Sequence, residues 1–154
     1  MLHAYSEKPV SRQRLLKCLS QRDCAILTVY LNKRKVYTKL QEEKAVLYNY
    51  VTNILLDRIF TRKLVSIDQE IIFIASKRET NAFLNENFKS YLKDQALNSH
   101  KVSLNIEIKT PAEEKALQAV DFISWAIFRK HEYRDESYYD MIRKKIVEEN
   151  SLFP

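Results

Sequence analysis

The sequence contains no glycine at all in 154 residues. Average glycine usage is near 7%, so about 11 glycines would be expected in a chain of this length. Walker loops, dinucleotide-binding fingerprints and nucleophile elbows all need positions without a Cβ atom. The chain is therefore not a standard P-loop enzyme, Rossmann-cofactor enzyme or nucleophile-elbow hydrolase.

Cysteine and long apolar runs are also scarce. The two cysteines, Cys18 and Cys24, lack CxxC spacing, which favours a reducing compartment. The longest apolar runs, such as residues 25–31, fall far short of the roughly 20 residues that span a bilayer. We therefore expect a cytoplasmic protein without a membrane partner.

Charge is plentiful and only moderately unbalanced. The chain has 26 Lys and Arg against 20 Asp and Glu, a formal net charge of +6, and 45% hydrophobic residues. The length and apolar content suit one domain over residues 1–154 with an ordinary core. The positive balance makes nucleic acid a candidate partner, although the two signs are mixed along the chain.

The hydrophobic pattern predicts five helices and three strands. Helical spacing covers residues 11–22, 41–61, 79–97, 112–129 and 137–148. Short apolar runs at residues 25–31 and 71–75 predict buried strands, and strict alternation at 102–108 predicts a half-exposed one. The order of these elements indicates an α/β layered domain.

Asp121 is the main acidic candidate for a functional residue. On a helical wheel centred on Val120, Asp121 lies about 100° away, at the border of the predicted buried stripe. A carboxylate in that position is either a paired structural residue or a group delivered into a cleft beside the sheet. The spacing alone leaves both alternatives open.

The segment around Asp121 resembles a known family. Residues 116–126, Ala-Leu-Gln-Ala-Val-Asp-Phe-Ile-Ser-Trp-Ala, are similar to the closing Leu-Gln-x-Ala-Asp helix of the domain of unknown function 3800 family. Supporting similarities lie at Asn32-Lys33, Leu47–Tyr50, Arg129-Lys130 and Tyr138-Tyr139. The resemblance runs from about Ser11 to Val147.

That resemblance implies a ribonuclease H-like α/β fold, a layered sheet with flanking helices. In such folds carboxylates from two strands and a late helix hold Mg²⁺ or Mn²⁺ for phosphodiester hydrolysis. Asp121 matches the late-helix carboxylate. The family's opening Asp-Glu-Ser strand has no counterpart here, which predicts a domain truncated at the N-terminus. The middle strand ends in Ala75-Ser76-Lys77-Arg78 instead of an aspartate.

Basic residues follow both buried strands. Lys33 matches the family's lysine after the first strand, and Lys77 and Arg78 follow the second. If the two strands are parallel neighbours, these residues face one cleft at the carboxyl edge of the sheet. We expect Lys33, Lys77 and Arg78 to bind an anion there.

Three hypotheses about function follow. The leading one is a truncated or degenerate relative of metal-dependent nucleases, with little activity alone and no cofactor. The alternatives are an active nuclease using Mg²⁺ or Mn²⁺ through Asp121, and a non-catalytic module that binds nucleic acid or protein. Because the apolar strand at residues 25–31 would lack neighbours in a truncated domain, we also expect a homodimer or a partner chain that covers its edge.

Overall fold

The computed structural model describes residues 1–153 and has a mixed α/β composition, as the hydrophobic pattern predicted. The chain divides into two compact units. Unit 1 contains Met1–Ile26 and Lys109–Val147, and unit 2 contains Leu27–Ile108 and the residues from Glu148 onward. The single domain over residues 1–154 stays a prediction, because compactness alone does not establish whether the units unfold together.

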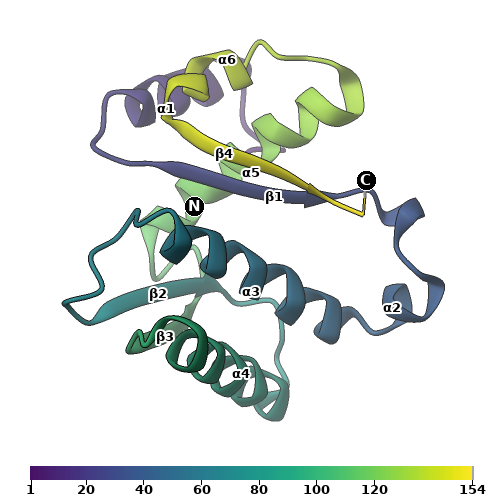
Figure 1. Ribbon diagram of the computed structural model, residues 1–154. Coiled ribbons are helices and arrows are strands. Elements are labelled where there is room, and N and C mark those ends of the chain that lie inside the picture. Colours follow the sequence, from purple (N-terminus) through teal and green to yellow (C-terminus); the bar gives the residue numbers. More distant parts are fainter. Residues whose placement is uncertain (154) are drawn as a thin grey trace. The chain divides into compact units, whose positions relative to one another are not determined.

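Unit 1 is built from helices (Figure 1): α1 (Pro9–Ser20), α5 (Lys115–Tyr133), α6 (Tyr139–Ile142) and the 3₁₀ helix η2 (Arg143–Lys145). Its core is made by side chains that are 0% exposed, among them Leu16, Phe122 and Ile142, one from each α-helix. Burial of a large apolar side chain contributes about 1.5–3 kcal/mol. This cluster therefore holds together segments that lie more than 100 residues apart in the sequence.

Unit 2 contains the helices α2 (Thr38–Glu42), α3 (Lys44–Thr61) and α4 (Ala82–His100), with the 3₁₀ helix η1 (Lys33–Lys35). Strands β2 (Ile71–Ser76) and β3 (Leu104–Lys109) form a small parallel sheet. The core lies between this sheet, α3 and α4, and includes Leu56, Phe88, Leu92 and Ile106. None of the helices in residues 1–153 combines the length and apolarity needed to cross a bilayer.

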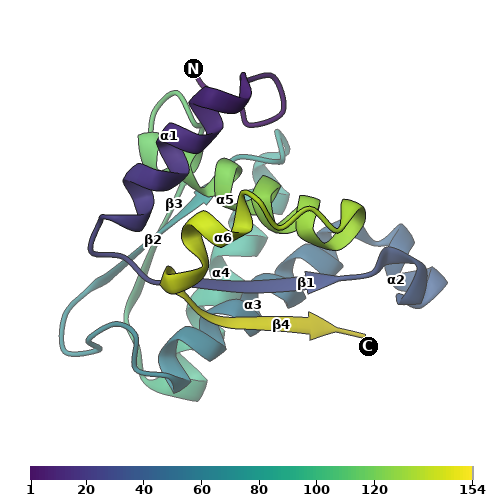
Figure 2. The ribbon, with the colours of Figure 1, turned by 90° about the horizontal axis from the view of Figure 1, so that it is seen from above.

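Strand β1 (Ile26–Leu31) pairs with β4 (Ile146–Leu152), and the two arrows run in the same direction in both views (Figures 1 and 2). The predicted helix at residues 137–148 is thus wrong at its end: α6 and η2 continue to Lys145, but residues from Ile146 onward belong to β4. Strand β4 begins with two β-branched residues, Ile146 and Val147. Its hydrogen-bonding partner, β1, lies far away in the sequence, so the local pattern does not reveal the pairing. The homodimer or partner chain at residues 25–31 stays a prediction, although β4 already supplies one neighbour.

The strands form two separate two-stranded sheets, β1-β4 and β2-β3. Within residues 1–153, β1 and β2 are therefore not hydrogen-bonded neighbours, which corrects the expectation of one sheet carrying both. The predicted helix over residues 41–61 is also interrupted, because Glu43 adopts a ψ of 66° between α2 and α3. Pairing partners and such breaks depend on tertiary contacts that the local pattern does not contain.

The helices end without glycine. The Asn81 side chain caps α4 by accepting the N–H groups of Phe83 and Leu84, at 2.9 and 3.3 Å. Lys101 and Arg134, which follow α4 and α5, take the left-handed conformation with φ of 53° and 54°. Glycine is the usual residue there because it has no Cβ to clash. The chain thus accepts local strain at helix ends.

Helix α5 buries a face that only partly overlaps the predicted one: Leu117 and Ile127 of the predicted stripe are buried, but its centre is not. Val120, the centre of the predicted stripe, is 53% exposed, whereas Phe122 and Ala126 are 0% exposed. These two residues lie four apart on one face and join Leu16 and Ile142 in the core of unit 1. The stripe was centred on the wrong residue, because Val120 and Phe128 are apolar but exposed.

Candidate anion-binding site

Two of the three predicted anion-binding residues lie around one cavity of unit 2. Lys33 sits in η1 directly after β1, and Arg78 lies two residues beyond β2. Both line a cavity of about 480 Å³ together with Lys44, at the start of α3. Lys77 is exposed and is not among the lining residues. The structure therefore brings Lys33 and Arg78 together without Lys77.

Local hydrogen bonds fix the segment that carries Lys33. The Asn32 side chain accepts the N–H of Arg34 at 3.0 Å, which closes the turn of η1. Further along, the Gln41 side chain donates to the carbonyl oxygen of Val36, whose side chain is buried. These contacts hold the chain between β1 and α3 in a defined course, so Lys33 has a fixed backbone position.

The charge of this cavity has one sign. Among its lining residues are three cations and no carboxylate; the others are Leu31, Val36, Gln41, Leu47, Tyr48 and Val51. Within residues 1–153, no carboxylate lies within ion-pair distance of Lys33, Lys44 or Arg78. Three cations without internal counter-ions attract an anion from solution.

Tyr48 forms the centre of the site. The Arg78 guanidinium lies 4.5 Å from the centroid of its ring, within cation–π range, and the ring of Phe88 stacks on it at 5.2 Å. Burial raises the pKa of the Tyr48 phenol, against the opposing charge of Arg78. Tyr48 is therefore a neutral, rigidly packed platform that orients Arg78.

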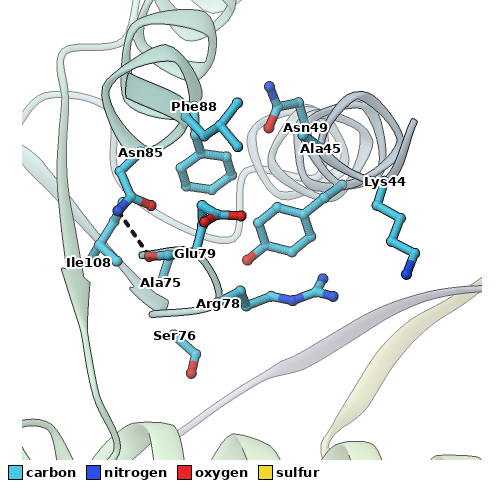
Figure 3. A pocket seen from close by; sticks show the side chains of 12 residues that line it. Lys44, Ala45, Asn49, Ala75, Ser76, Arg78, Glu79, Asn85, Phe88 and Ile108 are labelled. Carbon is cyan, nitrogen blue, oxygen red and sulfur yellow. Dashed lines mark hydrogen bonds between the residues drawn. The ribbon is translucent and has the colours of Figure 1, made fainter. Parts of the chain in front are cut away.

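A second cavity, of about 210 Å³, shares Lys44, Tyr48 and Arg78 with the first (Figure 3). Its apolar lining residues are Ala45, Ala75, Leu84, Phe88 and Ile108, and its polar ones include Asn49, Ser76, Glu79 and Asn85. The Asn85 amide donates to the carbonyl oxygen of Glu79 at 3.1 Å, which the dashed line in Figure 3 marks. The site thus joins a cationic part to an apolar part with a polar rim.

Asp121, the predicted metal ligand, lies in unit 1. Its carboxylate accepts the backbone N–H of Ala4 at 3.0 Å and lies 3.8 Å from Nδ1 of His3. Residues 1–153 contain no group of three or more His, Cys, Asp and Glu side chains that could hold a metal ion. The residues around Asp121 therefore do not fit the Mg²⁺ or Mn²⁺ site that the resemblance implies.

Lys44 is the lining cation that the sequence did not reveal as a candidate. It lies one helical turn before Tyr48, so the two side chains share a face of α3. That spacing is the only local signal, and it does not show that the face borders a cavity.

Comparisons of the chain with protein-family models, curated proteins and solved structures found no match.

Proposed function

We propose that this protein binds nucleic acid through its phosphates, using Lys33, Lys44 and Arg78 of unit 2. The observation that carries the proposal is one cavity lined by three cations, none of them paired with a carboxylate of residues 1–153. Lys and Arg contacts to phosphate dominate the affinity of proteins for nucleic acids. A volume of about 480 Å³ also lies within the roughly 300–1,000 Å³ of typical ligand sites.

The aromatic and apolar walls favour nucleic acid over a simple inorganic anion. Tyr48 lines both cavities, and its ring already carries the planar guanidinium of Arg78. Single strands are commonly bound by a positive groove combined with planar side chains on which bases stack. A single-stranded ligand therefore matches this site better than a duplex, whose bases are stacked inside.

A ribonuclease H-like origin remains part of the proposal. It is supported by the residues of the Leu-Gln-x-Ala-Asp-like motif, which lie within the long helix α5, and by the mixed α/β composition. The proposal adds no hydrolytic step, because Asp121 is engaged with Ala4 and its surroundings do not fit a metal ion. Binding without cleavage is the function that the described residues support best.

Anisotropy of a fluorescein-labelled 12-nucleotide single-stranded RNA, titrated with the protein at low salt, tests the proposal. Lys33→Glu and Arg78→Glu should each weaken binding by about tenfold, and neutralising a contact should reduce the salt slope by about 0.7. Lys93→Glu is the matched control, because Lys93 is an exposed cation on α4 that lines neither cavity. Equal losses in all three variants would refute a defined site.

A further inference from the structure

We infer that the smaller cavity receives a nucleobase that carries an exocyclic amine, next to a phosphate held by Lys44 and Arg78. This inference rests on the proposed function, since it supposes that the larger cavity holds a phosphate. Lys44, Tyr48 and Arg78 line both cavities, so a ligand in one touches the residues that border the other. In Figure 3 the side chains of Lys44 and Arg78 extend toward the same edge of the smaller cavity.

The smaller cavity suits a flat, largely apolar group. Its walls include Ala75 and Phe88, both buried, together with Leu84 and Ile108. Because Phe88 is fixed by its stacking on Tyr48, the cavity is formed in advance of binding. Unpaired bases are typically taken up in this way, with apolar or aromatic side chains at the faces and polar groups at the edge.

Glu79 gives the polar rim its chemical preference. One oxygen of its carboxylate, Oε1, accepts the N–H groups of Thr80 and Asn81, both at 2.9 Å. The other oxygen, Oε2, has no hydrogen bond within residues 1–153. A carboxylate accepts hydrogen bonds only, so this oxygen favours a base edge that presents N–H donors. Cytosine, adenine and guanine carry such an amine, whereas uracil presents carbonyl oxygens in its place.

Asparagine side chains complete the rim. Asn85 is held by its bond to the Glu79 carbonyl, which leaves its Oδ1 as an acceptor. The Asn49 side chain makes no hydrogen bond within residues 1–153, and its amide offers both donors and an acceptor oxygen. Together, a carboxylate and two amides can accept from an amine and also donate to an adjacent ring nitrogen or carbonyl. This is the pattern along the base-pairing edge of cytosine.

Short homopolymers of cytidine and uridine provide the test. The two bases have the same size and differ along the base-pairing edge, where cytosine has an amine and a bare N3, and uracil has a carbonyl oxygen and an N3–H. At pH 7.5, a 12-nucleotide cytidine strand should bind the wild-type protein about tenfold more tightly than the matching uridine strand. Glu79→Gln keeps an acceptor for the Thr80 and Asn81 amides but adds donors at the edge. We expect this variant to reduce the preference to less than threefold.

The outcomes separate the two proposals. If both strands bind the wild-type protein equally and Lys33→Glu weakens both, the base-pocket inference is wrong and the phosphate-binding function stands. If the preference survives in Glu79→Gln, the inference is wrong as well, because the selectivity lies elsewhere. If neither strand binds at low salt, the proposed function itself fails. Circular dichroism of each variant establishes that the fold is retained.

Discussion

Arg129 and Arg143 of unit 1 differ in their partners from the cations around the larger cavity of unit 2. In unit 1, Arg129 is hydrogen-bonded to Asp135, and Arg143 to Glu136 and Asp140. In unit 2, the cations around the larger cavity have no such partners within residues 1–153. Paired charges hold a fold together, and unpaired convergent charges attract a ligand. Unit 2 also contains paired charges, such as Arg58 with Glu148, so the contrast lies between ion pairs that stabilise the fold and the unpaired cations of the candidate site.

The largest expected change in the free energy of unfolding comes from a substitution in the core of unit 1. Phe122→Ala removes a ring that is 0% exposed and should lower the free energy of unfolding by about 3–5 kcal/mol. Chemical denaturation followed by circular dichroism measures the change. RNA binding by the folded fraction should stay within twofold of wild type, because the candidate site lies in unit 2.

Asp121 should behave as a structural residue. Asp121→Ala removes the acceptor of the Ala4 amide and should cost about 1 kcal/mol, the typical worth of one hydrogen bond. Asp121→Asn keeps an acceptor oxygen and should cost less. Thermal melts of both variants test this, alongside RNA titrations that should remain unchanged. Loss of RNA binding in Asp121→Asn with an intact fold would mean that unit 1 contributes to the site.

The strained ends of the helices offer a gain in stability. Lys101→Gly in unit 2 relieves a left-handed conformation costing about 1–2 kcal/mol and loses about 0.5–1 kcal/mol of chain entropy. The net stabilisation should be about 0.5–1 kcal/mol. Lys93→Gly, inside α4, is the control and should destabilise by about 1 kcal/mol. Arg134→Gly should give the same gain in unit 1.

The smallest effects concern acidic pH. Hydrogen bonds from Arg58, at 2.7 and 3.1 Å, lower the pKa of Glu148, and bonds from Ser137 lower that of Asp135. A lowered folded-state pKa adds stability above the ordinary pKa, which is lost as pH falls through the lowered one. Glu148→Gln and Asp135→Asn should therefore be less stable than wild type at pH 7.

For both variants, the difference from wild type should shrink as the pH falls below the ordinary values of 4.5 and 3.8. Urea unfolding midpoints measured from pH 7 to pH 2.5 give the profiles. A difference that persists unchanged at the acid end would show that packing, and not ionisation, is what the substitution removed. Comparing the two profiles tests whether the units respond alike.

The sequence predicted most of the local structure. The runs at residues 25–31 and 71–75 are strands β1 and β2, and the apolar periodicity located α1, α3, α4 and α5 to within a few residues. It missed β4, because Glu148, Glu149 and Asn150 carry no strand signal and their conformation depends on pairing with β1. The conformation of β4 is decided by a strand that lies more than 100 residues away in the sequence.

The candidate site was only partly predictable. Lys33 and Arg78 each follow a buried strand, which predicts them as anion-binding residues, and both line the larger cavity. The prediction that the two strands are neighbours in one sheet is wrong, because β1 and β2 belong to different sheets. Whether Lys44 and Tyr48 face the cavity depends on how α3 is rotated about its axis. A helix with several apolar faces does not reveal that rotation in its sequence.

The pairing of β1 with β4 also has a consequence for biosynthesis. About 120 residues separate the two strands, so at roughly 5–20 residues per second β1 waits about 6–24 s for its partner during translation. Throughout that interval an apolar strand is exposed on the nascent chain, where unpaired edges favour aggregation. Ribosome-bound chains stalled before Ile146 should therefore associate with holdase chaperones more strongly than chains stalled after Leu152 has emerged.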